Sequence, residues 1–204
     1  MGAHAIPWIV ALPLAGAVVN GLWGGRLGRR GVSRVACLSV LGAFVVSAAA
    51  ARDLAGGRAS AAVVHLFEWV AVADFRVSAS LQWDPLSALL ALLVTGVGFL
   101  IHVYSTGYMA GDPDYGRYFA VLNLFVASML VLVLGANLLV LFVGWELVGL
   151  CSYLLIGFWF ERPQAATAAK KAFIVTRVGD TGFLIGLFLI FASLGTLEVS
   201  AVLR

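Results

Sequence analysis

The sequence has few charged residues. Only 11% of its 204 residues are Asp, Glu, Lys or Arg, whereas about a quarter is typical of a soluble domain. Hydrophobic residues make up 62% of the chain. A chain of this composition cannot cover a water-exposed surface with polar groups, so the composition predicts an integral membrane protein.

Cysteine is also scarce. Cys37 and Cys151 lie on different apolar segments, and their spacing matches no zinc or redox motif. We expect both to be packed thiols. The sequence also lacks the glycine-rich pattern of dinucleotide-binding folds. The net charge is +3, but the basic residues are spread over short loops, so we do not expect nucleic-acid binding.

Long apolar runs dominate the rest of the sequence. A helix needs about 20 apolar residues to cross the hydrocarbon of a bilayer. Six segments approach or exceed this length and predict an all-α, polytopic membrane protein. Their approximate limits are 5–24, 35–51, 85–108, 118–134, 138–160 and 172–194. The fourth and fifth are separated only by "GAN", residues 135–137, which predicts a tight antiparallel helix pair.

The basic residues predict how these segments are oriented. With "GGRLGRRGVSR" (24–34) in the cytoplasm, the inner loops carry eight basic residues and the outer side four, as the positive-inside rule favours. Both ends of the chain are then expected on the outer side. The inner set is Arg26, Arg29, Arg30, Arg34, Arg117, Arg162, Lys170 and Lys171, and the outer set is Arg52, Arg58, Arg76 and Arg204.

The outer loop, residues 55–83, does not have a helical pattern. Its segment "VVHLFEWVAVADFRVSASLQW" has two runs of alternating residues, which predict a β-hairpin on the outer face. Trp69 and Trp83 are placed for the aromatic belt of the membrane interface. The hairpin could dock to a neighbouring subunit or could cover the helices of its own chain, and the sequence does not decide between these roles.

Three formal charges lie inside the predicted spans: Glu146, Arg177 and Asp180. A charge near the bilayer centre is costly and by default marks a functional path. With a rise of about 1.5 Å per residue, Glu146 and Asp180 are both expected near the midplane of two antiparallel helices. The alternative for Glu146 is a hydrogen bond between helices with no transport role.

Helical spacing groups further residues with these charges. Arg177 and Asp180 are i, i+3 neighbours and can form an ion pair, either as a relay or as a structural lock. Lys170 lies on the same stripe, so Lys170 and Lys171 could extend a proton or ion ladder to the inner surface, or could only reach lipid phosphates. His102, in the inner half of the third span, could be a relay or a packing residue.

Several motifs resemble one family. These are "LFVGWELVGLCSYLLIGFW" (141–159), "AAKKAFIVTRVGDTGFL" (168–184), "TGVGFLIHVYSTGYM" (95–109), "YFAVLNLFVASMLVLVL" (118–134) and "WVAVADFRVSASLQWDPLS" (69–87). Together they resemble the N-terminal part of the L subunit (chain 5 type) of respiratory complex I, NADH–quinone oxidoreductase. The A subunit of Mrp-type sodium/proton antiporters is a related family, and the wording of "VGLCSY" and "VTRVGD" favours complex I.

The resemblance implies a proton-translocating subunit of the membrane arm with an antiporter-like, inverted-repeat fold. It implies that NADH, FMN, iron–sulphur clusters and quinone belong to partner subunits, and that this chain is a non-redox part of the translocase. The expected partners are the adjacent antiporter-like subunit and the lipid bilayer, in a bacterial inner membrane. The alternatives are an Mrp-type Na⁺/H⁺ antiporter subunit or a structural, assembly subunit.

The resemblance also implies a longer protein. Residues 1–54 would be two N-terminal spans, 55–83 the hairpin, 84–117 the third span with its loop, and 118–204 the first three helices of an incomplete repeat. In the family, the glutamate matched by Glu146 pairs with a lysine on a later broken helix, and Arg177 and Asp180 match residues beside that pair. The lysine has no counterpart within these 204 residues, so we expect Glu146 to lack its cation and this segment alone not to translocate protons.

Overall fold

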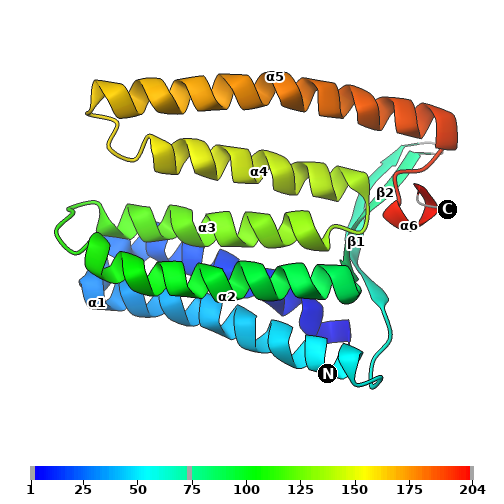
Figure 1. Ribbon diagram of the computed structural model, residues 1–204, viewed down its shortest axis with the longest axis horizontal. Helices are drawn as coiled ribbons and strands as arrows, with labels where there is room; N and C mark the ends of the chain where they lie inside the picture. The colour runs from blue at the N-terminus through cyan, green and yellow to red at the C-terminus, as the bar shows by residue number, and fades with distance from the viewer. Residues whose placement is uncertain (1–2, 73–74, 203–204) are drawn as a thin grey trace.

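The computed structural model describes residues 3–72 and 75–202. Its helices form a layered bundle, and a two-stranded sheet covers one end of it (Figure 1). The helices are α1 Ile6–Ala55, α2 Pro85–Tyr108, α3 Tyr115–Leu134, α4 Leu138–Ile156, α5 Pro163–Leu194 and the short α6 Val199–Val202; the strands are β1 Ala62–Val72 and β2 Phe75–Trp83.

Helix α1 contains two of the predicted spans. A straight helix of its 50 residues would be about 75 Å long, well beyond the thickness of a bilayer. The chain reverses at Gly28, whose φ of 65° is in the region that favours glycine. Gly16 in the first half then faces Ser39 in the second, and Figure 1 shows the two halves side by side. With α2 to α5, these halves give the six predicted spans.

Several helices begin or end at residues other than those predicted for the spans. Helix α3 begins at Tyr115, three residues before the predicted start, and α5 begins at Pro163, nine residues early. Pro163 occupies the first turn of α5, where its missing N–H costs nothing. Helix α4 ends at Ile156, four residues short of the prediction. The polytopic helical fold with a hairpin is therefore confirmed, with shifted boundaries.

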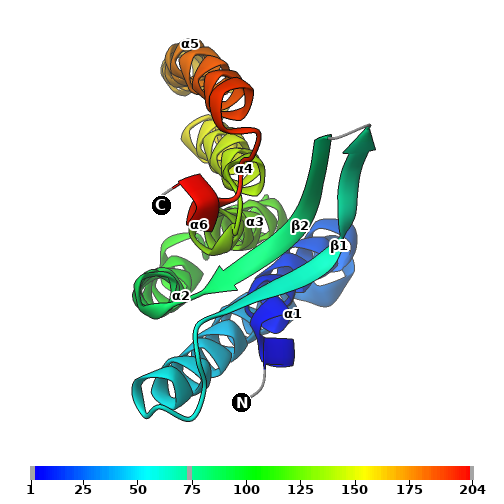
Figure 2. The same cartoon turned by 90° about the vertical axis from the view of Figure 1, so that its right-hand side faces the viewer.

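The six spans are not equally enclosed. The two halves of α1 pack with α2 and α3 around a core that contains Ile9, Val40 and Leu130. Helix α4 lies against α3, and α5 lies at the edge of the bundle, where it packs chiefly on α4 (Figures 1 and 2). Much of the apolar surface of α5 is exposed, including Val175, Val178 and Phe188.

The hairpin is confirmed as two antiparallel strands. Strand β2 packs onto the bundle: Leu81 and Trp83 are buried in the core, and the Asn137 amide donates to the Ser78 carbonyl at 2.7 Å. Strand β1 instead exposes Phe67 and Trp69. Strand β2 therefore covers the helices of its own chain, while Phe67 and Trp69 of β1 are partly exposed and also line a cavity beneath the hairpin.

Local sequence signals fix the helix ends beneath the hairpin. Asp84 caps α2 by accepting from the backbone N–H of Ser87, whose hydroxyl accepts from the backbone N–H of Asp84. Burial opposes ionisation of Asp84, but the hydrogen bonds from Ser87 and Gln82 outweigh it and lower the pKa of the carboxyl. Asn137 caps α4 through a bond from the Val140 N–H. These caps hold α2 and α4 in register beneath the sheet.

Candidate functional site

The charged residues in the middle of α4 and α5 meet in one place. Nη1 of Arg177 on α5 forms an ion pair with Oε2 of Glu146 on α4. Glu146 is the ninth of the 19 residues of α4, and Asp180 is the eighteenth of the 32 residues of α5. Glu146 and Asp180 therefore lie near the middle of their helices, as the sequence predicted.

The expectation that Glu146 lacks a cation was wrong. Arg177 provides one, because α4 and α5 are adjacent and antiparallel and place the two side chains opposite each other. A pattern along single helices could not reveal this contact, since it joins two helices. The Glu146 side chain is 23% exposed and that of Arg177 38%, so the pair lies on the flank of the helix pair.

Asp180 is the most buried of the three charges, at 6% exposure. Its Oδ2 lies 3.8 Å from Nη1 of Arg177, so the predicted i, i+3 ion pair exists but is longer than a hydrogen bond. Its Oδ1 accepts a 2.6 Å hydrogen bond from Nε1 of Trp145 on α4. Trp145 was missed from the sequence, because an indole next to an acid in an apolar run gives no distinct signal.

The ion pair with Glu146 does not use all the N–H donors of Arg177. Its Nε is buried without a hydrogen-bond partner in the described part of the chain, and its guanidinium carbon lies 4.6 Å from the centre of the Phe173 ring. An arginine side chain carries five N–H donors, so one guanidinium can serve two acceptors in turn. Arg177 is thus placed to exchange between Glu146 and Asp180.

A cavity of about 230 Å³ lies beside these charges. It is a half-open, mostly apolar space lined by α3, α4 and α5, and Asp180 forms part of its wall. Its few polar lining residues include Ser152, Tyr153 and Thr176. A space of this size with several polar groups can hold water next to a buried carboxylate.

The two lysines of the predicted ladder do not join this site. Lys170 and Lys171 are exposed on the N-terminal third of α5, and neither has a hydrogen bond or ion pair within residues 3–72 and 75–202. Their positions fit side chains that reach toward the membrane surface.

His102 lies in another part of the bundle. It is fully buried on α2, where Nδ1 contacts the Gly98 carbonyl oxygen at 2.8 Å, and its ring faces Phe119 on α3. The structure shows no ion pair of His102 with the charges of α4 and α5 in the described residues. Its Nε2 is buried without a hydrogen-bond partner among the described residues.

The glycines of α4, and Gly157 directly after it, have different surroundings. Gly157 faces α5, since a side chain there would meet Ala169. Gly149 has open space around it and lines the cavity next to Asp180. The closest approach is at Gly144, where an added Cβ would lie 2.5 Å from the backbone nitrogen of Leu132 on α3.

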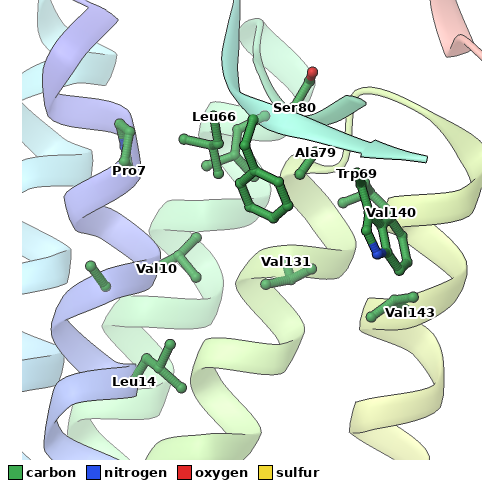
Figure 3. Close-up of a pocket in the computed structure, with 13 residues that line it drawn as sticks. Pro7, Val10, Leu14, Leu66, Trp69, Ala79, Ser80, Val131, Val140 and Val143 are labelled. Carbon is green, nitrogen blue, oxygen red and sulfur yellow. The ribbon is translucent and has the colours of Figure 1, made fainter. Parts of the chain in front are cut away.

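A second cavity, of about 400 Å³, lies beneath the hairpin (Figure 3). Its walls come from α1, α3, α4 and both strands, and include Val10, Leu66, Trp69 and Val143. The Ser80 hydroxyl contacts Nδ1 of His65 at 2.9 Å instead of filling the cavity. No charged side chain lines this space, so it does not fit an ion path.

Among the described residues, no cluster of His, Cys, Asp and Glu side chains has the arrangement of a metal site. The chemistry available at the α4–α5 site is therefore that of an arginine shared between two carboxylates. Such a group can hold, release and exchange a proton or a charge within a membrane.

Comparisons with known proteins agree with this arrangement. Residues 69–119 match the family model of the complex I (NADH–ubiquinone oxidoreductase) chain 5 N-terminus, and residues 135–204 match that of the NADH:quinone oxidoreductase/Mrp antiporter transmembrane region. The chain is 49% identical over 99% of its length to subunit L of NADH-quinone oxidoreductase from Mycobacterium tuberculosis, and 45% identical over 93% to that from Escherichia coli.

The solved structures agree as well. The fold matches a chain of the Mrp complex from Dietzia sp. DQ12-45-1b with a TM-score of 0.80 and 27% identity, over 97% of this chain and 20% of that one. The present chain covers 32% of the M. tuberculosis relative and 31% of the E. coli relative. It therefore spans about a third of the length of the curated relatives it matches.

The bundle, the hairpin and the charges between α4 and α5 define an antiporter-like membrane subunit. Within this class, the chain belongs to the subunit L, or chain 5, family of NADH–quinone oxidoreductases, and it corresponds to the N-terminal third of its relatives. The resemblance seen in the sequence is confirmed.

Proposed function

We propose that the full-length protein is a proton-translocating subunit in the membrane arm of an NADH–quinone oxidoreductase, complex I. The observation that carries this proposal is the Glu146–Arg177 ion pair at the middle of α4 and α5, with Asp180 beside it. Charges at this depth are costly unless they act or are paired. Here one cation serves two carboxylates, which suits a switch better than a fixed pair.

The switch has two arrangements. In the first, Glu146 is ionised and holds Arg177. In the second, Glu146 takes up a proton and releases Arg177, which moves the short distance to Asp180. Each cycle would load and unload a proton at Glu146, with the cavity of about 230 Å³ beside Asp180 as part of the route. Lys170 and Lys171 would attract and exchange protons at the inner surface, and we assign His102 a packing role.

The same proposal also covers the membrane in which the protein lies, its orientation there and its partner subunits. The protein lies in the cytoplasmic membrane of a bacterium with the arginine-rich turn of α1 inside, because eight basic residues then face the cytoplasm and four face outward. The first and last described residues both lie at the hairpin end, the outer side (Figure 1). The adjacent antiporter-like subunit is the expected neighbour, and the exposed face of α5 is covered by further parts of the membrane arm. NADH, FMN, iron–sulphur clusters and quinone bind in partner subunits.

The test is Glu146→Gln in the full-length protein within its assembled complex. Gln keeps the size of the side chain but cannot ionise, so Arg177 loses the charge that it pairs with. We expect electron transfer from NADH to quinone to continue while the protons pumped per electron pair fall sharply. Proton uptake into inverted membrane vesicles, measured together with NADH oxidation, gives this ratio.

Glu161→Gln is the matched control, because Glu161 is exposed in the loop before α5. It should leave both the electron transfer and the pumping ratio unchanged. A normal pumping ratio in Glu146→Gln would contradict the proposal. If the ratio also stayed normal after replacement of Arg177 and Asp180, the protein would be a structural or assembly subunit.

An Mrp-type Na⁺/H⁺ antiporter subunit is the second candidate. It is favoured by the fold match to the Mrp complex, although the identity there is 27%, compared with 49% and 45% to the two subunit L relatives. Vesicles in sodium-free buffer separate the two. Pumping driven by NADH oxidation without sodium supports complex I, whereas proton movement that needs a sodium gradient supports the antiporter.

A further inference from the structure

Trp145 closes a ring of contacts around the buried charges. It precedes Glu146 on α4, and its Nε1 donates to Oδ1 of Asp180 on α5 at 2.6 Å. Glu146 contacts Arg177, and Arg177 lies 3.8 Å from Asp180. Two successive residues of α4 therefore hold two charged residues one turn apart on α5.

The indole matters because Asp180 is so enclosed. With 6% exposure, its carboxylate has lost most of its hydration, and a buried carboxylate without donors is strongly destabilised. The indole N–H is its one hydrogen-bond donor within the described residues, since Arg177 stays beyond hydrogen-bond distance. The hydrogen bond from Trp145 thus stabilises the Asp180 carboxylate without the help of Arg177.

The position of Arg177 depends on that bond. A guanidinium near two carboxylates will favour the one with fewer donors of its own. Because Trp145 already donates to Asp180, Arg177 is left to Glu146, which has no other hydrogen bond or ion pair among the described residues. Without the indole N–H, Arg177 would gain more by moving to Asp180.

We propose that Trp145 is a positioning residue that sets which carboxylate holds Arg177. This inference rests on the proposed function, because it names Trp145 as the residue that decides which of the two arrangements of the switch is favoured. A hydrogen bond to a charged group is strong enough to shift such an equilibrium by about tenfold or more. Trp145 therefore favours the arrangement in which Glu146 is paired and ready to exchange a proton.

The simpler role for Trp145 is packing alone. Its ring stands edge-on against Phe183 of α5, with the ring centres 6.1 Å apart. Trp145→Phe separates the two roles, since phenylalanine keeps an aromatic ring against Phe183 but has no N–H. If packing were the whole role, Arg177 would remain on Glu146 in this variant.

The experiment uses the full-length protein in its complex. In Trp145→Phe, we expect electron cryo-microscopy to find the Arg177 guanidinium hydrogen-bonded to Asp180 and separated from Glu146, and we expect fewer protons pumped per electron pair. In the double variant Trp145→Phe/Asp180→Asn, the side chain at position 180 is a neutral amide that no longer attracts Arg177. Arg177 should therefore return to Glu146. Trp159→Phe is the control, because that indole also donates to a carboxylate, Asp112, at 2.8 Å in the inner loop.

The outcomes distinguish the two proposals. Arg177 remaining on Glu146 in Trp145→Phe, or an equal loss of pumping in Trp159→Phe, overturns the role of Trp145. If Glu146→Gln impairs pumping while Trp145→Phe behaves as the unaltered protein, only the positioning role is wrong. If Glu146→Gln itself pumps normally, the proposed function is wrong, whatever position Arg177 takes.

Discussion

Arg177 on α5 is the cation that Glu146 on α4 contacts, and this contact joins the middles of two adjacent helices. Asp180, one turn further along α5, lies close enough to compete for the same guanidinium. The two helices are therefore linked by a group of charges and not by apolar packing alone.

Removing Arg177 should harm the protein more than removing Glu146. Arg177→Gln leaves two carboxylates close together without a cation, whereas Glu146→Gln leaves Arg177 with Asp180 as its partner. Breaking a fully buried pair from one side costs about 3–5 kcal/mol, and the partial exposure of Arg177 and Glu146 places this case below that range. We expect clearly less assembled complex with Arg177→Gln than with Glu146→Gln, measured on native gels.

The matched control for this prediction is Arg162→Gln. Arg162 is exposed and lies over the Trp159 ring at 4.9 Å, outside the charged group. Its loss should leave assembly unchanged. Equal amounts of complex in Arg177→Gln and Glu146→Gln would show that Arg177 does not stabilise the two carboxylates.

The sequence was sufficient for those features that depend on one segment at a time. The apolar lengths predicted the spans, the alternating pattern predicted the hairpin, and the depth of Glu146 and Asp180 followed from the rise of a helix. The start of α5 was placed too late because residues 163–171 combine alanines with Gln, Thr and Lys and lack large apolar side chains, although Pro163 marks a typical first turn.

The contacts between segments could not be predicted in the same way. The Glu146–Arg177 pair and the Trp145–Asp180 bond depend on the rotation of α4 against α5, which helical spacing leaves open. Gly144 and Gly149 look equivalent in the sequence, yet only Gly144 lies against a neighbouring backbone. Pairing between helices is set by packing, and a pattern along one helix does not contain it.

Gly144 gives a prediction about the packing that supports the site. A methyl group there would lie 2.5 Å from the backbone nitrogen of Leu132, and backbone cannot move aside as a side chain can. Gly144→Ala should separate α3 from α4 and cost about 3 kcal/mol, the upper part of the range for overpacking. The effect is a lower apparent melting temperature of the purified complex.

Gly149→Ala is the companion variant, on the same helix but with nothing within 4 Å of the added methyl group. Alanine favours a helix over glycine by about 1 kcal/mol, so its melting temperature should stay the same or rise slightly. Similar losses in both variants would mean that helix packing at Gly144 is not the cause.

His102 gives a prediction that separates packing from proton relay. Its Nδ1 contacts the Gly98 carbonyl of its own helix, and its ring packs against Phe119, away from the charges of α4 and α5. His102→Gln keeps a polar, uncharged group but cannot carry a proton as imidazole does. We expect the protons pumped per electron pair to stay normal, with a stability loss of about 1 kcal/mol from the changed buried hydrogen bond. Vesicle pumping assays should include Glu146→Gln as the impaired reference. A fall in His102→Gln comparable to that reference would place His102 on the proton path, and the transport route would then extend from α4 and α5 into the α1–α2–α3 core.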